Sequence, residues 1–441
     1  MENALGLDDP GSILRDIGPK WFGSIAAIDG ARLMIAGLSG IARIGDRLTV
    51  DRSTGGPLPA EVIGVNGKML VAFAFGTPSG AAAGDAVLLD RHSAVARPSR
   101  AWIGSTLNWR GARFDGSEPA RGTKGFPLDA APPPAPWRKK LGERLATGHA
   151  AFDTFLPLCK GQRIGLFAGS GIGKSMLLGG LSQRVDADVC VIALIGERGR
   201  EVRAFVEDTL GAEGMARSIV IASTSDESAL AKREGARLAM TVAESFRAQG
   251  DQVLLIFDSL TRFAEAHREV ALAAGEPPSL HAFPPSTFNA IASLAERAGP
   301  GVDGEGDITA IFSVLVAGSD MEEPVADMVR GILDGHVILD RKIAERGRFP
   351  AIDIRRSVSR SLPAAASASE NALLAEARAL LSAYEDSELI IRAGLYTPGS
   401  DKVIDRAIRV FPALDRFFAE IGDDAPERRF EALHGILAEN A

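Results

Sequence analysis

The sequence is poor in cysteine: its 441 residues include only Cys159 and Cys190. Cys190 lies within an apolar run, where we expect a small buried hydrophobic side chain and neither a metal ligand nor a disulfide partner. A chain with so few thiols fits the reducing environment of the cytosol.

Long hydrophobic runs are also missing. No stretch of about 18 or more apolar residues occurs that could form a transmembrane helix. Residues 1–4 carry neither the basic segment nor the apolar segment that begins a signal peptide. We therefore predict a cytoplasmic protein.

The sequence has no excess of positive charge. Its formal net charge is -8, and 24% of its residues are charged. This balance argues against bulk electrostatic attraction to nucleic acid or to an anionic membrane, although it leaves a local basic patch open. A chain of 441 residues is too long for one hydrophobic core, so we expect two or three domains.

Changes in the sequence pattern divide the chain into four parts. Residues 1–20 are interrupted by Pro-Gly and Gly-Pro pairs and predict a flexible arm whose few apolar residues could dock on a partner. Residues 21–96 alternate short apolar stretches with Gly and Asp, which predicts a small N-terminal β-barrel. Residues 97–360 begin with a connector rich in Pro and Gly, which resists regular structure. Residues 361–441 are rich in Ala and apolar at helical spacing, which predicts a C-terminal helical domain.

Buried strands alternate with helical stretches from about residue 151 to 350, which predicts an α/β domain with a mainly parallel sheet covered on both faces. The predicted strands are 164–168, 189–195, 219–222, 253–257, 308–316 and 337–339. In the C-terminal part, Leu373, Leu374, Ala377, Leu380, Leu381, Val403, Ala407, Ile408 and Phe411 share the helical spacing of a core face. We expect these last helices to pack without taking part in chemistry.

A glycine-rich turn follows the first of these strands and precedes an aliphatic helix, which is the arrangement of a phosphate-binding loop. Glycines direct backbone N–H groups toward one point, and the helix dipole adds positive potential there. We expect Lys174 to reach the outer phosphates and Ser175 to place its hydroxyl on a magnesium ion. The predicted nucleotide-binding residues are Gly169, Ser170, Gly171, Ile172, Gly173, Lys174, Ser175 and Met176.

Two carboxylates follow other predicted strands. Asp258 ends an apolar strand at the edge where ligands of open α/β sheets bind, so we assign it to the magnesium site, with a helix cap as the alternative. Glu197 also follows a strand and could orient the water that attacks the γ-phosphate. On the residues alone, a solvated salt-bridge cluster explains the run Glu-Arg-Gly-Arg-Glu at 197–201 equally well.

Several segments together resemble the rotary-type ATPase superfamily, and within it the flagellar protein-export ATPases that serve type III secretion. The segments are 161–180, 196–202, 258–264, 275–278, 283–286, 296–299, 331–336 and 357–360. The likeness runs from about residue 25 to 420. It implies a nucleotide-binding domain that follows an N-terminal barrel along the chain, with ATP as the substrate and Mg²⁺ as the cofactor.

The resemblance also implies roles for individual residues. Glu197 matches the glutamate that activates water, and Asp258 matches the aspartate of the magnesium shell. Arg198 and Arg262 match arginines near the γ-phosphate. Arg360 matches an arginine finger donated across a subunit interface, and Phe349 matches an aromatic residue that packs on adenine. For Phe349 a core position is the alternative, and for Arg360 the alternative is a carboxylate partner in its own subunit.

The function that the resemblance implies is ATP hydrolysis that assists flagellar protein export. It implies a homohexameric ring at the cytoplasmic face of the export apparatus, peripheral to the membrane export gate, with a regulator, a stalk protein, exported flagellar proteins and their chaperones as partners. The closest alternative is a virulence-type secretion ATPase. An RNA translocase of the terminator type is disfavoured by the acidic balance and by the lack of an aromatic base-stacking run in 20–95. A non-catalytic subunit would not need Glu197. We expect no specific nucleic-acid partner.

Overall fold

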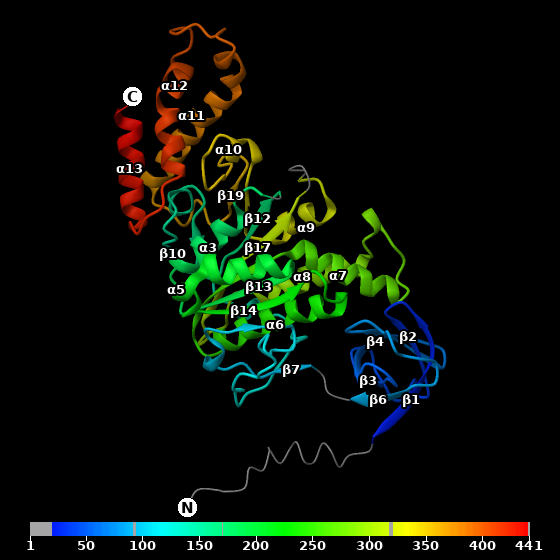
Figure 1. Ribbon diagram of the computed structural model, residues 1–441. Coiled ribbons are helices and arrows are strands. Elements are labelled where there is room, and N and C mark those ends of the chain that lie inside the picture. The colour runs from blue at the N-terminus through cyan, green and yellow to red at the C-terminus, as the bar shows by residue number, and fades with distance from the viewer. Residues whose placement is uncertain (1–19, 91–93, 170, 317–320, 440–441) are drawn as a thin grey trace, which may run out of the picture. The chain divides into compact units, whose positions relative to one another are not determined.

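The computed structural model describes residues 20–90, 94–169, 171–316 and 321–439 (Figure 1). The predicted arm at 1–20 therefore lies, apart from Lys20, outside the described residues. The described chain forms two compact units. The first unit contains residues 20–90 and 269–277, and the second contains the remainder. The boundary at residue 360 between the ATPase domain and the helical domain, both within the second unit, stays a prediction.

The first unit is built around a closed six-stranded barrel, as the sequence predicted. Its strands pair in the order β1-β2-β5-β4-β3-β6, and each neighbouring pair is antiparallel. The strands are β1 (Trp21–Asp29), β2 (Arg32–Ala36), β3 (Arg47–Asp51), β4 (Leu58–Asn66), β5 (Met69–Ala74) and β6 (Ala86–Asp90).

Alternating side chains fill the barrel. In β2 and β3 every second residue is buried, so that Leu33, Ile35, Leu48 and Val50 point into one core. Two hairpins close with two-residue turns whose first residue is a glycine at positive φ, as in the β4–β5 turn at Gly67 (φ 60°). This conformation suits the right-handed twist of the flanking strands and costs other residues energy.

The second unit contains a nine-stranded sheet within the described residues, with the order β19-β18-β12-β17-β15-β13-β14-β8 and with β16 paired to β17. All pairs are parallel except those of β16 and β19. The strands are β8 (Thr106–Leu107), β12 (Arg163–Ala168), β13 (Val189–Glu197), β14 (Ser218–Thr224), β15 (Gln252–Asp258), β16 (Gly299–Pro300), β17 (Asp307–Leu315), β18 (Gly335–Ile338) and β19 (Val358–Ser359). Every strand predicted for this domain is present, and the predicted mainly parallel sheet is confirmed.

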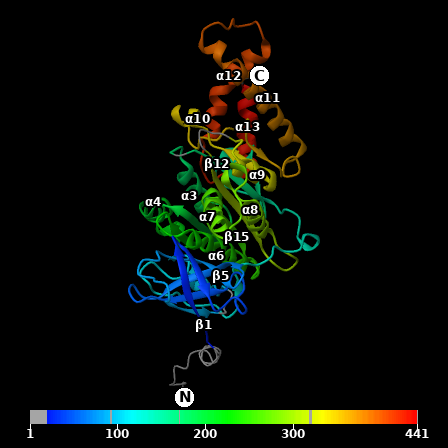
Figure 2. The same cartoon turned by 90° about the vertical axis from the view of Figure 1, so that its right-hand side faces the viewer.

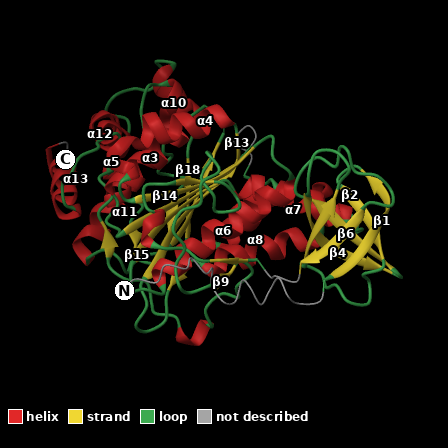
Figure 3. Ribbon diagram, turned by 60° about the horizontal axis from the view of Figure 1, so that its bottom comes forward, coloured by secondary structure: helices red, strands yellow, loops and turns green. Residues whose placement is uncertain are grey.

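Helices cover both faces of this sheet (Figure 3). Because side chains alternate along a strand, Ile192 and Leu194 enter one core with α3, whereas Val191 and Ala193 enter the other with α6 and α8. Burial on both sides explains why these strands read as continuous apolar runs. The helices of this part are α3 (Lys174–Arg184), α4 (Gly199–Ala204), the π-helix η3 (Phe205–Leu210), α5 (Gly211–Met215), α6 (Ala229–Arg247), α7 (Leu260–Ala273), α8 (Pro285–Arg297) and α9 (Pro324–Ile332).

The connector 97–150 contains little regular structure, as its proline content predicted. Its short strands include β8, which joins the edge of the main sheet beside β14. The other elements around the connector are β7 (Val95–Ala96), β9 (Phe126–Pro127), β10 (Arg144–Leu145), β11 (Leu158–Cys159), the 3-10 helices η1 (Arg100–Trp102) and η2 (Ala135–Trp137), and the single-turn α2 (Ala150–Asp153).

Three helices end the chain and pack side by side (Figures 1 and 2). They are α11 (Ala368–Arg392), α12 (Lys402–Phe418) and α13 (Pro426–Glu439). Two short helices lie earlier in the chain: α10 (Arg341–Glu345) precedes α11, and the one-turn 3-10 helix η4 (Leu280–Ala282) precedes α8. Ser367 caps α11, and Glu370 completes a capping box. Leu374 and Ala407 are buried, but Val403 is 55% exposed, so its predicted core position is wrong. Val403 lies in the first turn of α12, and the buried residues of this helix begin at Ala407.

Both cysteines are buried, as predicted for Cys190, and neither forms a disulfide. No helix in the described ranges is long and apolar enough to cross a membrane.

Candidate nucleotide site

The glycine-rich turn lies between the end of β12 and the start of α3. Gly171 (φ 76°) and Gly173 (φ 86°) have the left-handed backbone that turns successive N–H groups toward one side. Gly173 caps α3, an eleven-residue helix that begins at Lys174, so the positive end of the helix dipole faces the turn. Ser170, a predicted binding residue, lies outside the described residues.

Lys174 meets two carboxylates. Its Nζ contacts Asp258 Oδ1 directly and lies 3.8 Å from Glu197 Oε1. Asp258 ends β15 and Glu197 ends β13, and these two strands are parallel neighbours, so both carboxylates arrive at the same edge of the sheet. The structure thus brings together three predicted site residues from segments up to 84 residues apart in the chain.

Glu197 titrates far from its ordinary range. Burial, and next the negative charge of Asp258, raise the pKa of Glu197 to about 7, whereas the Lys174 ammonium opposes this rise. The neighbouring Glu201 raises the pKa further through a hydrogen bond and its charge. A carboxyl with a pKa near neutral can exchange a proton at working pH, which is the property that a general base needs.

The two predicted arginines differ in position. Arg262, on α7, packs against Gly196, where an added Cβ would lie 3.0 Å from the Arg262 side chain. Its hydrogen bond to Glu265 raises the pKa of the guanidinium, and the charges of Glu197 and Asp258 contribute in the same direction. Arg198 is more exposed and pairs with Glu201 at 3.1 Å. Arg262 therefore lies near the two carboxylates, whereas the carboxylate that Arg198 contacts is Glu201.

The remaining residues of the turn and first helical turn have distinct surroundings. Ser175 and Met176 are exposed, and Ile172 is buried in the core beneath the turn. The half-exposed Phe349 lies beside the turn, since a Cβ on Gly173 would come within 3.1 Å of its ring. Phe349 is therefore placed to contact a group held by this turn.

Arg360 lies far from the other predicted site residues. Its backbone N–H donates to the carbonyl of Asp334 (3.0 Å), and Asp334 pairs with Arg163 at the first residue of β12. The phosphate loop follows the last residue of that strand. Six rises of about 3.3 Å lead from Arg163 to Gly169, the first residue of the loop, which places the two about 20 Å apart. This distance exceeds the reach of an arginine side chain.

One neighbour of the site was missed by the sequence reasoning. Ser313, on β17, donates a hydrogen bond to Asp258 Oδ1 (2.6 Å) and shares this oxygen with Lys174. Ser313 and Thr309 are the two hydroxyl residues in the otherwise apolar strand 308–316, and the one nearer the carboxyl end of the strand was the signal that could have identified Ser313. Glu201 was noted only as part of a charged turn, and its effect on Glu197 depends on the folded geometry.

The donor set fits magnesium and phosphate. Among the described residues no cluster of three His, Cys, Asp or Glu side chains exists that could hold a metal by itself. Ser175 and Asp258 supply a hydroxyl and a carboxylate, which are the hard oxygen ligands that Mg²⁺ prefers when phosphates complete its shell. The turn offers N–H groups and the Lys174 ammonium to those phosphates.

Comparison with known proteins places the chain in a family. Residues 148–359 match the ATP synthase alpha/beta family, nucleotide-binding domain, and residues 366–423 match the T3SS EscN ATPase C-terminal domain. The "Flagellum-specific ATP synthase" of Caulobacter vibrioides is 44% identical over 92% of each chain.

Two further relatives come from secretion systems. The "SPI-2 type 3 secretion system ATPase" of Salmonella typhimurium is 42% identical over 86% of this chain and 88% of the relative. The assembled ATPase EscN, solved in complex with its central stalk EscO from enteropathogenic E. coli, has a TM-score of 0.83 at 36% identity and covers 94% of this chain and 100% of EscN. The chain belongs to the flagellum-specific ATP synthases, within the ATP synthase alpha/beta family.

Proposed function

We propose that this protein hydrolyses ATP with Mg²⁺ and thereby assists the export of flagellar proteins through a type III secretion apparatus. The observation that carries the chemistry is the convergence of Lys174, Asp258 and Glu197 at the phosphate loop. Relatives named "Flagellum-specific ATP synthase", which are up to 46% identical to this chain, support the export role.

Each residue of the site has a part in the proposed reaction. Lys174 and Arg262 hold phosphate oxygens, and the loop N–H groups orient them. Ser175 and Asp258 would hold Mg²⁺, which would neutralise charge on the phosphates. Glu197, when ionised, accepts a proton from the attacking water. Phe349 packs on the base of the nucleotide.

Lys174 would have to turn at least one of its three N–H donors away from the carboxylates to hold phosphate. Its ammonium now contacts Asp258 and lies near Glu197, so nucleotide phosphates compete with two carboxylates for one cation. A contact of Lys174 with phosphate would be charge-assisted like its present contact with Asp258, whose carboxylate would help to hold Mg²⁺.

The test compares two substitutions at the site. Lys174→Ala should weaken nucleotide binding and hydrolysis together, whereas Glu197→Gln should bind Mg-ATP normally and lose about 10²–10⁴-fold in kcat. Glu213→Gln, a matched change of an exposed carboxylate on α5, should leave both unchanged. Removal of Mg²⁺ with a chelator should stop turnover, and added Mg²⁺ should restore it. A nearly normal kcat for Glu197→Gln would exclude it as the base.

Arg360 completes the site of a neighbouring subunit in this proposal. Its backbone lies about 20 Å from its own phosphate loop, measured along the six residues of β12, so it cannot serve its own site. In the described residues Arg360 forms no ion pair, and its guanidinium donates to the carbonyl of Arg330 (3.1 Å). A head-to-tail interface between identical chains would close into a ring, for which we propose a homohexamer.

Mixing two inactive variants tests the shared site. Arg360→Ala should bind ATP but lose turnover on the order of 10³-fold, as for arginine fingers generally. Equimolar Lys174→Ala should restore part of the activity, because an intact phosphate loop then faces an intact finger. Specific activity of the parent should also rise with protein concentration. Mixed rings without recovery would show that the finger does not act in trans.

We propose a cellular location and partners for the ring. The ring works at the cytoplasmic face of the flagellar export apparatus and associates peripherally with its membrane gate. Its partners are a stalk protein, in analogy to EscO on EscN, a regulator, and exported flagellar proteins with their chaperones.

A virulence-type secretion ATPase is the second candidate, because the SPI-2 relative is nearly as similar as the flagellar one. Expression in a strain that lacks its flagellum-specific ATPase tests the choice, with motility as the readout and Glu197→Gln as the negative control. Restored motility supports the flagellar assignment. Restored secretion only in a strain lacking its virulence-type ATPase would replace it.

A further inference from the structure

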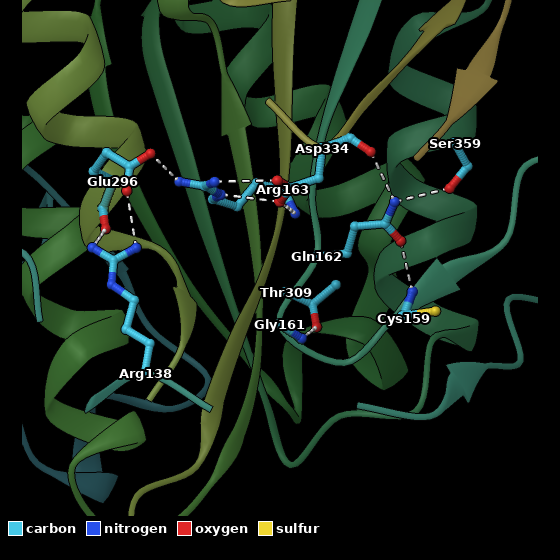
Figure 4. Close-up of polar contacts among 9 residues, drawn as sticks. All are labelled: Arg138, Cys159, Gly161, Gln162, Arg163, Glu296, Thr309, Asp334 and Ser359. Carbon is cyan, nitrogen blue, oxygen red and sulfur yellow. Dashed lines mark hydrogen bonds and ion pairs between the residues drawn. The ribbon is translucent and has the colours of Figure 1, made fainter. Parts of the chain in front are cut away.

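A chain of ion pairs passes through Arg163 (Figure 4). Arg163 is the first residue of β12, and the phosphate loop follows the other end of this strand. Arg138 donates to Glu296 Oε2 (2.9 Å), and Arg163 donates to Glu296 Oε1 (2.6 Å). Arg163 also binds the carboxylate of Asp334 through Nε (3.0 Å) and Nη2 (3.2 Å). Two arginines and two carboxylates thus alternate across segments of the connector, α8, β12 and the residue before β18.

Asp334 connects this chain to Arg360 through its backbone. Its carbonyl accepts the N–H of Arg360 (3.0 Å) and Nε2 of Gln162 (3.2 Å). The next residue, Gly335, pairs with Ser359 in the antiparallel β18–β19 ladder. A Cβ on Gly335 would lie 2.6 Å from the Val358 carbonyl, so the two strands approach as closely as glycine permits.

Ser359, which precedes Arg360, is held by a second set of bonds. Gln162 is fully buried and donates Nε2 to Ser359 Oγ (2.8 Å), while its Oε1 accepts the N–H of Cys159 (2.9 Å). Ser359 Oγ in turn donates to the carbonyl of Pro157 (2.7 Å). The hydroxyl therefore has both a donor and an acceptor partner in the core.

We propose that Gln162, Arg163, Asp334 and Ser359 are positioning residues for the Arg360 finger, which they hold in place for the neighbouring subunit. The inference rests on the proposed role of Arg360. The exposed guanidinium donates to the Arg330 carbonyl, whereas the backbone N–H of Arg360 is bonded to Asp334 and the hydroxyl of the preceding Ser359 is bonded to Gln162 and Pro157. An error of about 1 Å in the position of a reacting group can cost about 10² in rate.

The test separates positioning from general stability. Ser359→Ala removes the hydroxyl that links Gln162 to Pro157 and should lower kcat about 10- to 100-fold, with nucleotide affinity and KM within twofold of the parent. Ser359→Thr, which keeps the hydroxyl, should recover most of kcat. Ser357→Ala is the matched control, because Ser357 is also buried and bonded, but to Asp353 and Ile338 and not to the Arg360 peptide. It should keep kcat.

Mixed rings identify which site fails. The defect of Ser359→Ala should appear in the neighbour's site, so equimolar Lys174→Ala should raise its activity above that of either variant alone. If Ser359→Ala does not fold, Asp334→Asn provides the second test, since it keeps the backbone carbonyl and loses the bidentate pair with Arg163. The same kcat loss and the same recovery are expected.

The outcomes distinguish the inference from the function on which it rests. If Arg360→Ala loses turnover while Ser359→Ala and Asp334→Asn keep it, the positioning role is wrong and the finger stands. If both variants lose ATP affinity and Lys174→Ala does not rescue them, they act on their own phosphate loop and the inference also fails. If Arg360→Ala itself keeps its turnover, the proposed finger is wrong.

Discussion

The raised pKa of Glu197 predicts how activity depends on pH. Glu197 must be ionised to accept a proton from water, and its pKa is raised to about 7 by burial and by Asp258. The ionised fraction therefore grows as pH rises through 7. One unit below that pKa only about a tenth of the carboxyls are ionised. We expect kcat/KM, which reports the free enzyme, to fall about tenfold per unit below pH 7 and to level off above pH 8.

ATP titrates in the same range, because the second pKa of a phosphate group is about 6. A comparison of variants removes this contribution. Glu201 raises the pKa of Glu197 by a hydrogen bond and by its charge, so Glu201→Gln should lower that pKa. The ratio of the variant's activity to the parent's should therefore be higher at pH 6 than at pH 8. At pH 8 Glu197 is ionised in both proteins, so the lower pKa no longer helps the variant.

Glu207→Gln is the matched control for this experiment. Glu207 is exposed and pairs with Arg203 (2.9 Å), much as Glu201 pairs with Arg198 (3.1 Å), but it is not among the groups that shift the pKa of Glu197. The assay is steady-state ATP hydrolysis from pH 5.5 to 8.5 at a protein concentration where rings are complete. A ratio of Glu201→Gln to parent that does not change with pH would refute the assignment of the acid limb to Glu197.

Much of the fold could be predicted because its signals are local. Strands buried on both faces read as continuous apolar runs, which located β13 and β15, and the antiparallel barrel showed frequent turn residues. The two-residue strands β16 and β19 are too short to produce any such pattern. Val403 followed the helical spacing of the core face, but local periodicity cannot show where packing ends along α12.

The site could be predicted in part for a similar reason. Lys174, Glu197 and Asp258 follow the ends of parallel strands, and such ends share one edge of the sheet. The partners of these residues could not be derived from the sequence, since Ser313 lies 55 residues from Asp258. The pair of Arg163 with Asp334 spans 171 residues and depends on the order of the strands. That same order places Arg360 at the opposite edge of the sheet.

Two further predictions concern ligands and the phosphate loop. With a net charge of -8, the protein should show no appreciable stimulation of its ATPase by RNA or DNA at moderate salt, and a large stimulation by RNA in a hydrolysis assay would favour a translocase. Gly173→Ala should destabilise the protein in urea unfolding more than Gly171→Ala. Both substitutions force alanine into a left-handed conformation, which costs about 1–2 kcal/mol, but only at Gly173 does the new Cβ meet another residue, the Phe349 ring at 3.1 Å. The additional loss in the free energy of unfolding at Gly173 therefore measures the contact with Phe349. Equal losses in the free energy of unfolding for the two variants would mean that the ring moves away freely and is not fixed beside the loop.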